Sequence, residues 1–267
     1  MKKLLTVLLA VCLTLGVFAS CGKSSETVIK VAATSTPHAL ILEQCVPLLK
    51  EKGYTLEIKV MDGYIQENPA TEDGDVDANY FQHKPYLDDF NVKNKGHLVS
   101  IAQIHYEPYG IYAGTSKSLS AIPSGAKVAV PNDTTNEARA LLLLEQAGLI
   151  TLNPGLGLNT TKNDIAANPK NLDIVELDAS LIPGLLNELA VAVINGNYAI
   201  AAGFKVSEAL VVEDKNSTAA QTYANILVVK EGNENLPKIL ALKEALCSEA
   251  VKNYINATFE GSVIPIF

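Results

Sequence analysis

The strongest constraint on the fold is a regular alternation of strand and helix patterns along residues 28–267. Residues 28–33 and 56–60 have the apolar, β-branched composition of strands. Residues 39–52, which lie between them, have a helical pattern broken only by Pro47. This alternation predicts an α/β fold with largely parallel sheets.

The predicted strands and helices form two successive groups. The second group begins with a strand pattern at residues 126–130. Single segments near residues 106–112 and 222–227 connect the two groups. We therefore expect two lobes joined by a hinge. The predicted lobes are residues 28–109 plus 225–267, and residues 110–224.

The first 20 residues have the pattern of a secretory signal peptide. Two lysines precede an apolar stretch, residues 4–18, that is too short to span a bilayer comfortably. The sequence around Cys21 resembles a bacterial lipobox, in which the cysteine receives lipid and becomes the mature N-terminus. We expect a signal peptide at 1–20 and a lipidated tether at 21–27, which would anchor the domain to the extracytoplasmic face of the cell membrane.

Charge and arginine usage bear on the ligand. The net charge of −8 over 267 residues argues against nucleic acid as a partner. Arg139 is the only arginine, and it lies near the start of a helical pattern at residues 136–146, where Thr134 and Glu137 fit a capping box. A guanidinium grips a carboxylate with two bonds. Arg139 therefore predicts an anion site at this helix start; a solvated residue without function is the alternative.

Aromatic and polar side chains are concentrated at residues 77–86. The segment follows a short strand expected at residues 74–76, and Pro85 suits the first position of the next helix. Ligand sites on open α/β sheets usually lie where a strand ends and a helix begins. The cluster therefore favours a binding site, although each ring taken alone is better explained as a core residue.

None of the four cysteines forms a Cys-x-x-Cys pair, which argues against zinc-ribbon and thioredoxin-like sites. Cys12 lies in the leader and Cys21 at the lipobox. Cys45 and Cys247 lie in apolar helical patterns, so we expect buried thiols. The sequence leaves a disulfide between these two residues open.

Several segments, taken in order, resemble one family. They are residues 37–39, 74–87, 130–133, 168–172, 193–195 with 198–199, 213–215 and 223–225. They cover the mature chain and resemble the methionine-binding lipoproteins of the NlpA family, the substrate-binding components of ABC importers. The resemblance implies a two-lobed periplasmic-binding-protein type II fold with hinge strands and a ligand held between the lobes.

The resemblance also implies the residues that bind the ligand. The matching positions are Tyr64, Phe81, His83, Tyr86, Arg139, Asn195 and Asn225. Arg139 would bind the α-carboxylate of a free amino acid, and the two asparagines would bind its ammonium and carboxylate groups. The three aromatic residues and His83 would form a slot for an unbranched thioether, because sulfur packs favourably on ring edges. The expected partners are L-methionine or a related amino acid, and a permease with its ATPase.

Two segments depart from the family pattern. Residues 182–184 read Ile-Pro-Gly where the family usually has Leu-Pro-Arg, and residues 217–222 form a longer turn just ahead of Asn225. The longer turn could alter the hinge or the ligand preference. A different amino acid or a methionine-containing dipeptide is therefore the alternative ligand.

Two other classes of function have less support. A metal-binding lipoprotein could use the histidines of the chain, which are His38, His83, His97 and His105. No Cys or His pair, however, has the spacing of zinc ligands. An enzyme of a familiar class would show a nucleophile elbow, a P-loop or a His-Glu-x-x-His motif, and the sequence has none of them. We predict a binding protein without catalytic residues, cofactor or metal site.

Overall fold

The computed structural model describes residues 27–214 and 222–267. The predictions for the signal peptide, for Cys21 and for most of the 217–222 turn lie outside the described residues. In the part of the chain that is described, no helix is long and apolar enough to cross a membrane.

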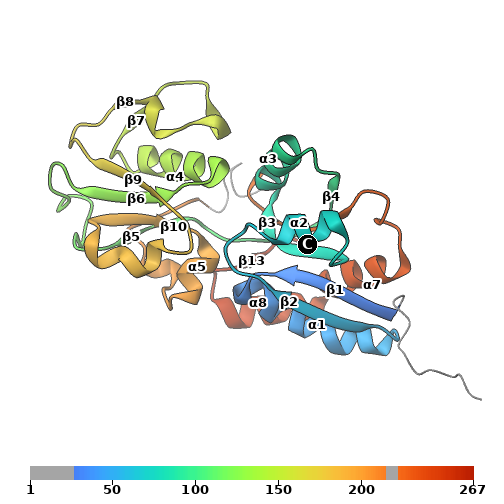
Figure 1. The fold of residues 1–267 in the computed structure, drawn as a ribbon. Coiled ribbons are helices and arrows are strands. Elements are labelled where there is room, and N and C mark those ends of the chain that lie inside the picture. The colour runs from blue at the N-terminus through green and yellow to red at the C-terminus, as the bar shows by residue number, and fades with distance from the viewer. Residues whose placement is uncertain (1–26, 215–221) are drawn as a thin grey trace, which may run out of the picture.

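The protein has two lobes, each built on its own sheet (Figure 1). Among the described residues, the first sheet has the order β13-β4-β12-β3-β1-β2 and the second has the order β11-β5-β10-β6-β9. The strands of the first sheet are β1 (Val28–Ala33), β2 (Thr55–Val60), β3 (Ala78–His83), β4 (Leu98–Tyr106), β12 (Asn225–Lys230) and β13 (Ile264–Pro265). Those of the second sheet are β5 (Gly110–Ala113), β6 (Lys127–Pro131), β9 (Asp173–Leu177), β10 (Val191–Ile194) and β11 (Val211–Val212), and a separate pair comprises β7 (Thr151–Leu152) and β8 (Ile165–Ala167).

Each sheet combines parallel and antiparallel strands, so the prediction of largely parallel sheets is wrong. Strand β1 is parallel to β2 and β3, whereas β12 is antiparallel to β3 and β4. Likewise β6 is parallel to β9 and β10, whereas β5 is antiparallel to β10 and β11. The physical reason is the route of the chain. Strand β12 returns to the first sheet from the second lobe, and therefore enters it from the opposite end.

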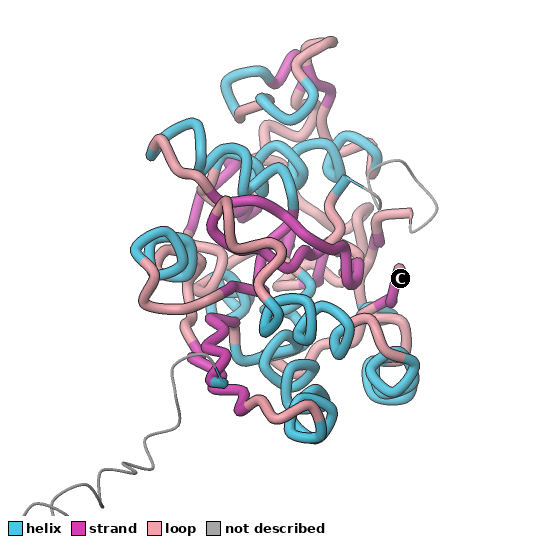
Figure 2. Tube along the Cα trace, turned by 90° about the vertical axis from the view of Figure 1, so that its right-hand side faces the viewer, coloured by secondary structure: helices cyan, strands magenta, loops and turns pink. Residues whose placement is uncertain are grey.

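Helices pack around the sheets, and some strand segments lie at the edge of the molecule (Figure 2). The first lobe has α1 (Leu40–Glu51), α2 (Glu67–Asp73), α3 (Lys84–Asn94), α7 (Pro237–Leu246), α8 (Glu249–Phe259) and the irregular turn η2 (Ser35–Ala39). The second lobe has α4 (Thr134–Gln146), α5 (Gly196–Ala201) and the short 3-10 helices η3 (Gly157–Asn159), η4 (Lys162–Asp164), η5 (Ile182–Glu188) and η6 (Val206–Glu208). Helices α3 and α4 contact each other across the boundary between the lobes.

Each lobe has its own apolar core. Ile29 of β1 and Ile41 of α1 are fully buried in the first, and Val193 of β10 and Leu141 of α4 are fully buried in the second. Burial of each such side chain contributes roughly 1.5–3 kcal/mol to the free energy of folding. Separate cores allow the lobes to act as rigid bodies around the segments that connect them.

Cys45 packs in the first core, and both it and Cys247 are free thiols. The disulfide that the sequence left open is therefore not formed. Burial raises the pKa of Cys45 to about 12, as expected of an unreactive core thiol.

The strand near residue 80 begins later than predicted. Helix α2 ends at Gly74, whose φ of 82° is the left-handed conformation that suits glycine, and β3 follows after it. Every side chain of β3 is buried. The amides of Asn79 and Gln82 are satisfied by Asn68 of α2, whose Oδ1 accepts from both. Because these buried residues are polar, the sequence lacks the apolar pattern by which a buried strand is recognised.

The start of α4 also differs from the prediction. The residue that caps the helix is Asp133, whose Oδ1 accepts from the backbone N–H of Asn136 at 3.0 Å. Glu137 instead accepts from the N–H of Lys162 at 2.9 Å. The predicted capping box of Thr134 and Glu137 is therefore wrong, because the preceding aspartate has the extended backbone of a cap. The carboxylate of Asp133 already occupies the helix start at which an anion site was expected.

Candidate ligand-binding site

A small pocket lies between the lobes, with an empty volume of about 360 Å³ that includes open solvent. Its lining contains all seven residues singled out from the sequence. The complete set is Tyr64, Phe81, Gln82, His83, Tyr86, Glu107, Asn136, Arg139, Asn195, Gly196, Asn197 and Asn225. The fold thus brings together residues that lie up to 161 positions apart, from Tyr64 to Asn225.

Aromatic rings form one side of the pocket. The ring of Tyr64 lies 5.9 Å from that of Phe81 and 6.0 Å from that of Tyr86, measured between centroids. The Tyr86 hydroxyl donates to the carbonyl of Tyr64 at 2.9 Å and fixes this loop residue, whose φ is 64°. Tyr198 of α5, which the sequence analysis did not single out, stacks 5.0 Å from Tyr64 across the lobe boundary.

His83 connects the aromatic side to the second lobe. It caps α3: its Nδ1 accepts from the N–H of Tyr86 at 3.2 Å, so its Nε2 carries the proton and donates to Asn136 Oδ1 at 3.2 Å. Burial, reinforced by the charge of Arg139, lowers the pKa of His83 to about 3. A neutral His83 therefore has a structural role as well as a place in the lining.

Arg139 is buried and already paired. Its Nε lies 3.1 Å from Glu213 Oε1, and its Nη2 lies 2.5 Å from Glu213 Oε2 and 3.0 Å from the carbonyl of Glu107. The guanidinium carbon lies 4.4 Å from the ring centroid of Tyr109 and 4.2 Å from that of Tyr223. Burial by itself would lower the pKa of Arg139, but Glu213 raises it overall. The guanidinium is a fixed cation, and Nη1 takes no part in these bonds.

The two asparagines are held by neighbouring side chains. Asn195 accepts from the Tyr109 hydroxyl at 3.1 Å and donates to Asn136 Oδ1 at 3.0 Å. Asn225 Oδ1 lies 2.9 Å from His38 Nε2. Because the Thr34 hydroxyl lies 2.6 Å from His38 Nδ1 and can donate to it, Nε2 carries the proton and donates to Asn225. His38 thereby fixes the orientation of the Asn225 amide, with Oδ1 towards His38.

A buried carboxylate, Glu107, was missed by the sequence analysis. Its Oε1 accepts from His105 Nε2 at 2.7 Å and lies 3.6 Å from His38 Nε2. Burial lowers the pKa of His38 to about 4 and that of His105 to about 3, so both rings are neutral near pH 7. Burial raises the pKa of Glu107. The available signal was an isolated acid in the aromatic stretch that joins the two lobes, residues 104–112.

These three residues bear on the metal-binding alternative. Potential ligand atoms of His38, His105 and Glu107 lie within 4.8 Å of one another. His83 instead bonds to Asn136, and His97 is exposed beside Glu72. The four histidines of that alternative therefore do not converge on one point. The polar atoms of the buried group are bonded to one another and to neighbouring side chains.

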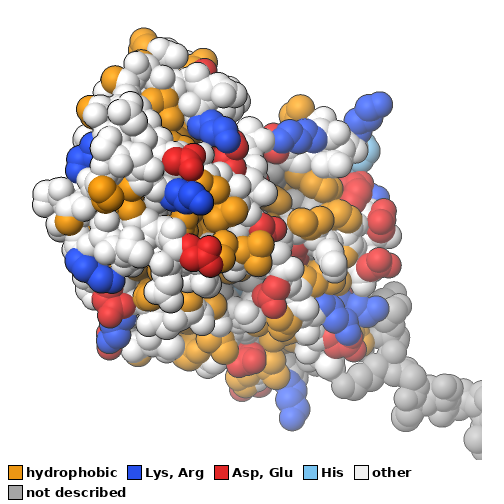
Figure 3. All heavy atoms as spheres, turned by 60° about the vertical axis from the view of Figure 1, so that its left-hand side comes forward, with side chains coloured by type: hydrophobic (Ala, Val, Ile, Leu, Met, Phe, Trp, Pro, Cys, Tyr) orange, Lys and Arg blue, Asp and Glu red, His pale blue; other side chains and the backbone are white. Residues whose placement is uncertain are grey.

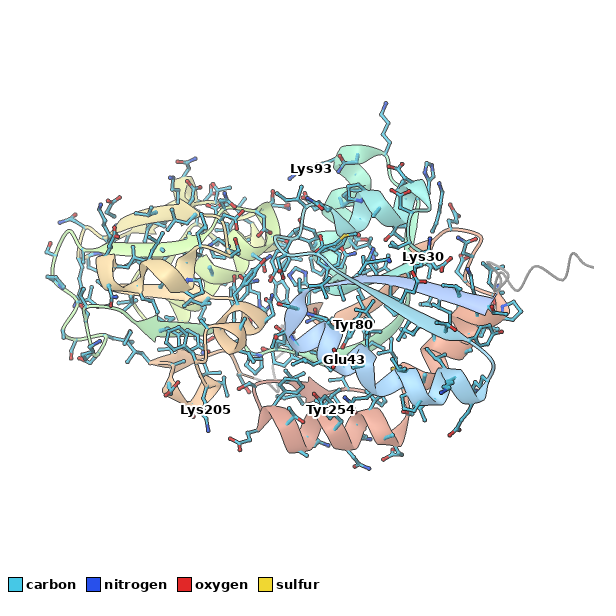
Figure 4. The ribbon with its side chains drawn as sticks, turned by 60° about the horizontal axis from the view of Figure 1, so that its bottom comes forward. Lys30, Glu43, Tyr80, Lys93, Lys205 and Tyr254 are labelled. Carbon is cyan, nitrogen blue, oxygen red and sulfur yellow. The ribbon has the colours of Figure 1, made fainter. Side chains whose placement is uncertain are left out.

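Polar contacts join the two lobes. At the pocket, the Tyr64 hydroxyl donates to Asn197 Oδ1 at 2.5 Å. Outside the pocket lining, Lys93 Nζ donates to Thr134 Oγ1 at 2.7 Å, so that its side chain reaches from α3 to the start of α4, and Figure 4 labels Lys93 on the first lobe. The lobes are therefore in contact at both places. On the outer surface shown in Figure 3, acidic and basic side chains are interspersed.

A pocket between two lobes, with a buried cation on one side and aromatic rings on another, defines a two-lobed ligand-binding protein. The chain belongs to the NlpA lipoprotein family, whose model matches residues 29–267. The resemblance seen in the sequence and the two-lobed α/β fold are thereby confirmed.

Named relatives share the family and the fold. The chain is 43% identical to the methionine-binding lipoprotein MetQ of Bacillus subtilis, over 94% of each chain. The crystal structure of a lipoprotein from Ruminococcus gnavus has a TM-score of 0.89 and is 56% identical, covering 90% of this chain and 100% of that one. A nutrient-binding protein of Burkholderia cenocepacia, solved bound to methionine, has a TM-score of 0.85 and is 39% identical, covering 90% and 100%.

Proposed function

We propose that this protein is the extracytoplasmic substrate-binding lipoprotein of an ABC importer and binds free methionine between its lobes. The observation that carries the proposal is the pairing of a buried cation, Arg139, with a wall of rings from Tyr64, Phe81 and Tyr86 in one small pocket. The cation suits an α-carboxylate, and the rings suit a thioether side chain. The names of the relatives from Bacillus subtilis and Burkholderia cenocepacia support the same ligand.

The mechanism is capture without chemistry. Open lobes admit the ligand, and residues of both lobes contact it only when the lobes close, so the ligand favours the closed form by its differential affinity. The closed form then delivers the amino acid to a membrane permease driven by an ATPase. Lipid on Cys21 keeps the protein at the membrane. No step requires a catalytic residue or a cofactor.

The division of the chain into lobes is part of the proposal. We assign residues 28–109 plus 225–267 to one lobe and residues 110–224 to the other. Strands β1–β4, β12 and β13 share one sheet, and β5, β6 and β9–β11 share the other, which supports these boundaries. The crossing segments lie at residues 107–109 and between β11 and β12.

The test is calorimetric titration of the purified lipoprotein in detergent micelles, after bound ligand has been removed by dialysis. L-Methionine should bind more tightly than D-methionine, leucine or glutamine. A protein that binds a methionine-containing dipeptide better than the free amino acid would support the alternative ligand. Absence of binding to every methionine compound would contradict the proposal.

A further inference from the structure

We propose that the carboxylate of Glu107 receives the α-ammonium group of the amino-acid ligand. This inference deepens the proposed function and rests on it. It assigns the ammonium group to an acid that the sequence analysis did not single out, rather than to the amides of Asn195 and Asn225.

The position of Glu107 favours this role. Glu107 lies on the segment between β4 and β5, lines the same pocket as Arg139 and is only 5% exposed. His105 Nε2 donates to its Oε1 at 2.7 Å, and the backbone N–H of Asn197 also bonds to the carboxylate. A Cβ atom added at Gly196 would lie 2.8 Å from Glu107 Oε2. The pocket wall is therefore built closely around this carboxylate, which is held in place from both lobes.

The charges around Glu107 favour the same role. Among the described residues, the basic side chains within ion-pair distance of the Glu107 carboxylate are His38 and His105, which are neutral. Arg139 lies near enough for its charge to act on Glu107, but it donates to the backbone carbonyl of Glu107 and forms its ion pair with Glu213. A buried carboxylate without a cationic partner is costly. An α-ammonium group in the pocket would supply that partner.

The orientation of the pocket amides also favours Glu107. Asn225 Oδ1 already accepts from His38, which takes one of its two acceptor positions, while Nδ2 remains a donor for the ligand. Asn195 Oδ1 already accepts from the Tyr109 hydroxyl. Donor groups suit the ligand carboxylate, and an ionised carboxylate is the stronger acceptor for an ammonium group. Glu107 and Arg139 would thus recognise the two charges of a zwitterion.

The experiment compares L-methionine with 4-(methylthio)butanoate, which has the same thioether and carboxylate but lacks the amino group. Affinities for the full-chain lipoprotein in micelles are measured by calorimetry for the parent, Glu107→Gln and Glu137→Gln. Glu137 is a matched control because it is a buried glutamate of the second lobe that does not line the pocket. Circular dichroism establishes that each variant is folded.

Glu107→Gln should weaken binding of L-methionine about 10- to 100-fold, as expected when a hydrogen bond between charged groups is lost, and should leave affinity for the analogue within about threefold. Glu137→Gln should change neither. Equal loss for both ligands, or L-methionine affinity within threefold of the parent, would overturn the inference. The parent protein gives a second test that needs no variant. If it binds both compounds with equal affinity, Glu107 does not bind the ammonium group. If the parent binds neither compound, the proposed function fails and this inference fails with it.

Discussion

Arg139 of α4 and Glu213, the residue that follows β11, form a buried ion pair at the place where the chain crosses between the lobes. Glu213 Oε2 also accepts from the Tyr106 hydroxyl at 2.5 Å, and Tyr106 is the last residue of β4. The pair therefore links the second lobe to the end of the strand that leads out of the first lobe. The guanidinium that faces the pocket is fixed by the hinge region itself.

Arg139→Lys should weaken methionine binding at least about 100-fold, because an ammonium group cannot form the paired bonds to Glu213 and contact the ligand at the same time. Calorimetric titration of the parent and the variant measures the change. Lys127→Arg, on the exposed start of β6, is the control for a basic substitution. Unchanged affinity in Arg139→Lys would show that the ligand carboxylate is bound elsewhere.

Glu213→Gln should destabilise the protein by about 3–5 kcal/mol, because it leaves the buried charge of Arg139 without its counter-ion. Burial by itself would raise the pKa of Glu213, but Arg139 and the hydrogen bonds it receives lower it overall. Since the folded-state pKa is depressed, this stabilisation is present above about pH 4.5 and is lost as the pH falls through the folded-state value. Urea unfolding should therefore show a difference between parent and variant at pH 7 that shrinks below pH 4. A difference that is constant with pH would contradict the ion-pair assignment.

Tyr64→Phe should speed dissociation of methionine about 2- to 12-fold, because it removes the hydroxyl that bonds to Asn197 across the lobes but keeps the ring. Stopped-flow fluorescence or ligand-chase kinetics measures the rate. Tyr254→Phe, on α8 away from the pocket, should have no effect. Equal dissociation rates for the parent and Tyr64→Phe would mean that this bond does not stabilise the closed form.

Glu67→Gln should remove a pH-dependent loss of stability. Glu67 is fully buried, its Oε1 has no hydrogen-bond partner among the described residues, and burial raises its pKa to about 7. The folded-state pKa of Glu67 lies above the unfolded value of about 4.3. The contribution of Glu67 to stability is therefore fully present below about pH 4.3 and is lost as the pH rises to about 7. The parent should lose about 3 kcal/mol relative to the variant between pH 4.5 and pH 8. Urea titrations at both pH values test this, with Glu43→Gln on the exposed face of α1 as the control.

The family, the two-lobed architecture and seven of the twelve residues that line the pocket could be predicted from the sequence. The strands at residues 28–33 and 191–194 are short apolar runs, and such runs can be recognised from the sequence alone. Strand β3 was placed wrongly because Asn79 and Gln82 are buried amides that resemble loop residues. Sequence patterns report the chemistry of a side chain, whereas its burial depends on what packs around it.

The partners within the site could not be predicted. Glu213 lies 74 positions after Arg139, and Glu107 meets His38 across 69 positions, so neither contact has a local signal in the sequence. The same holds for the rotation of the Asn225 amide, which His38 sets. The family resemblance indicated residues of the pocket, but only the structure shows which of their atoms form hydrogen bonds and ion pairs with one another.

We propose that the pocket between Arg139 and the aromatic wall holds methionine, and native mass spectrometry of the gently purified lipoprotein can detect the bound ligand itself. We expect a bound species with the mass of methionine, released on denaturation and identified as the L-enantiomer by chiral chromatography. Binding should be restored when methionine is added back to the stripped protein. A different amino acid or a dipeptide in the bound fraction, together with stripped protein that does not take up methionine, would contradict the account.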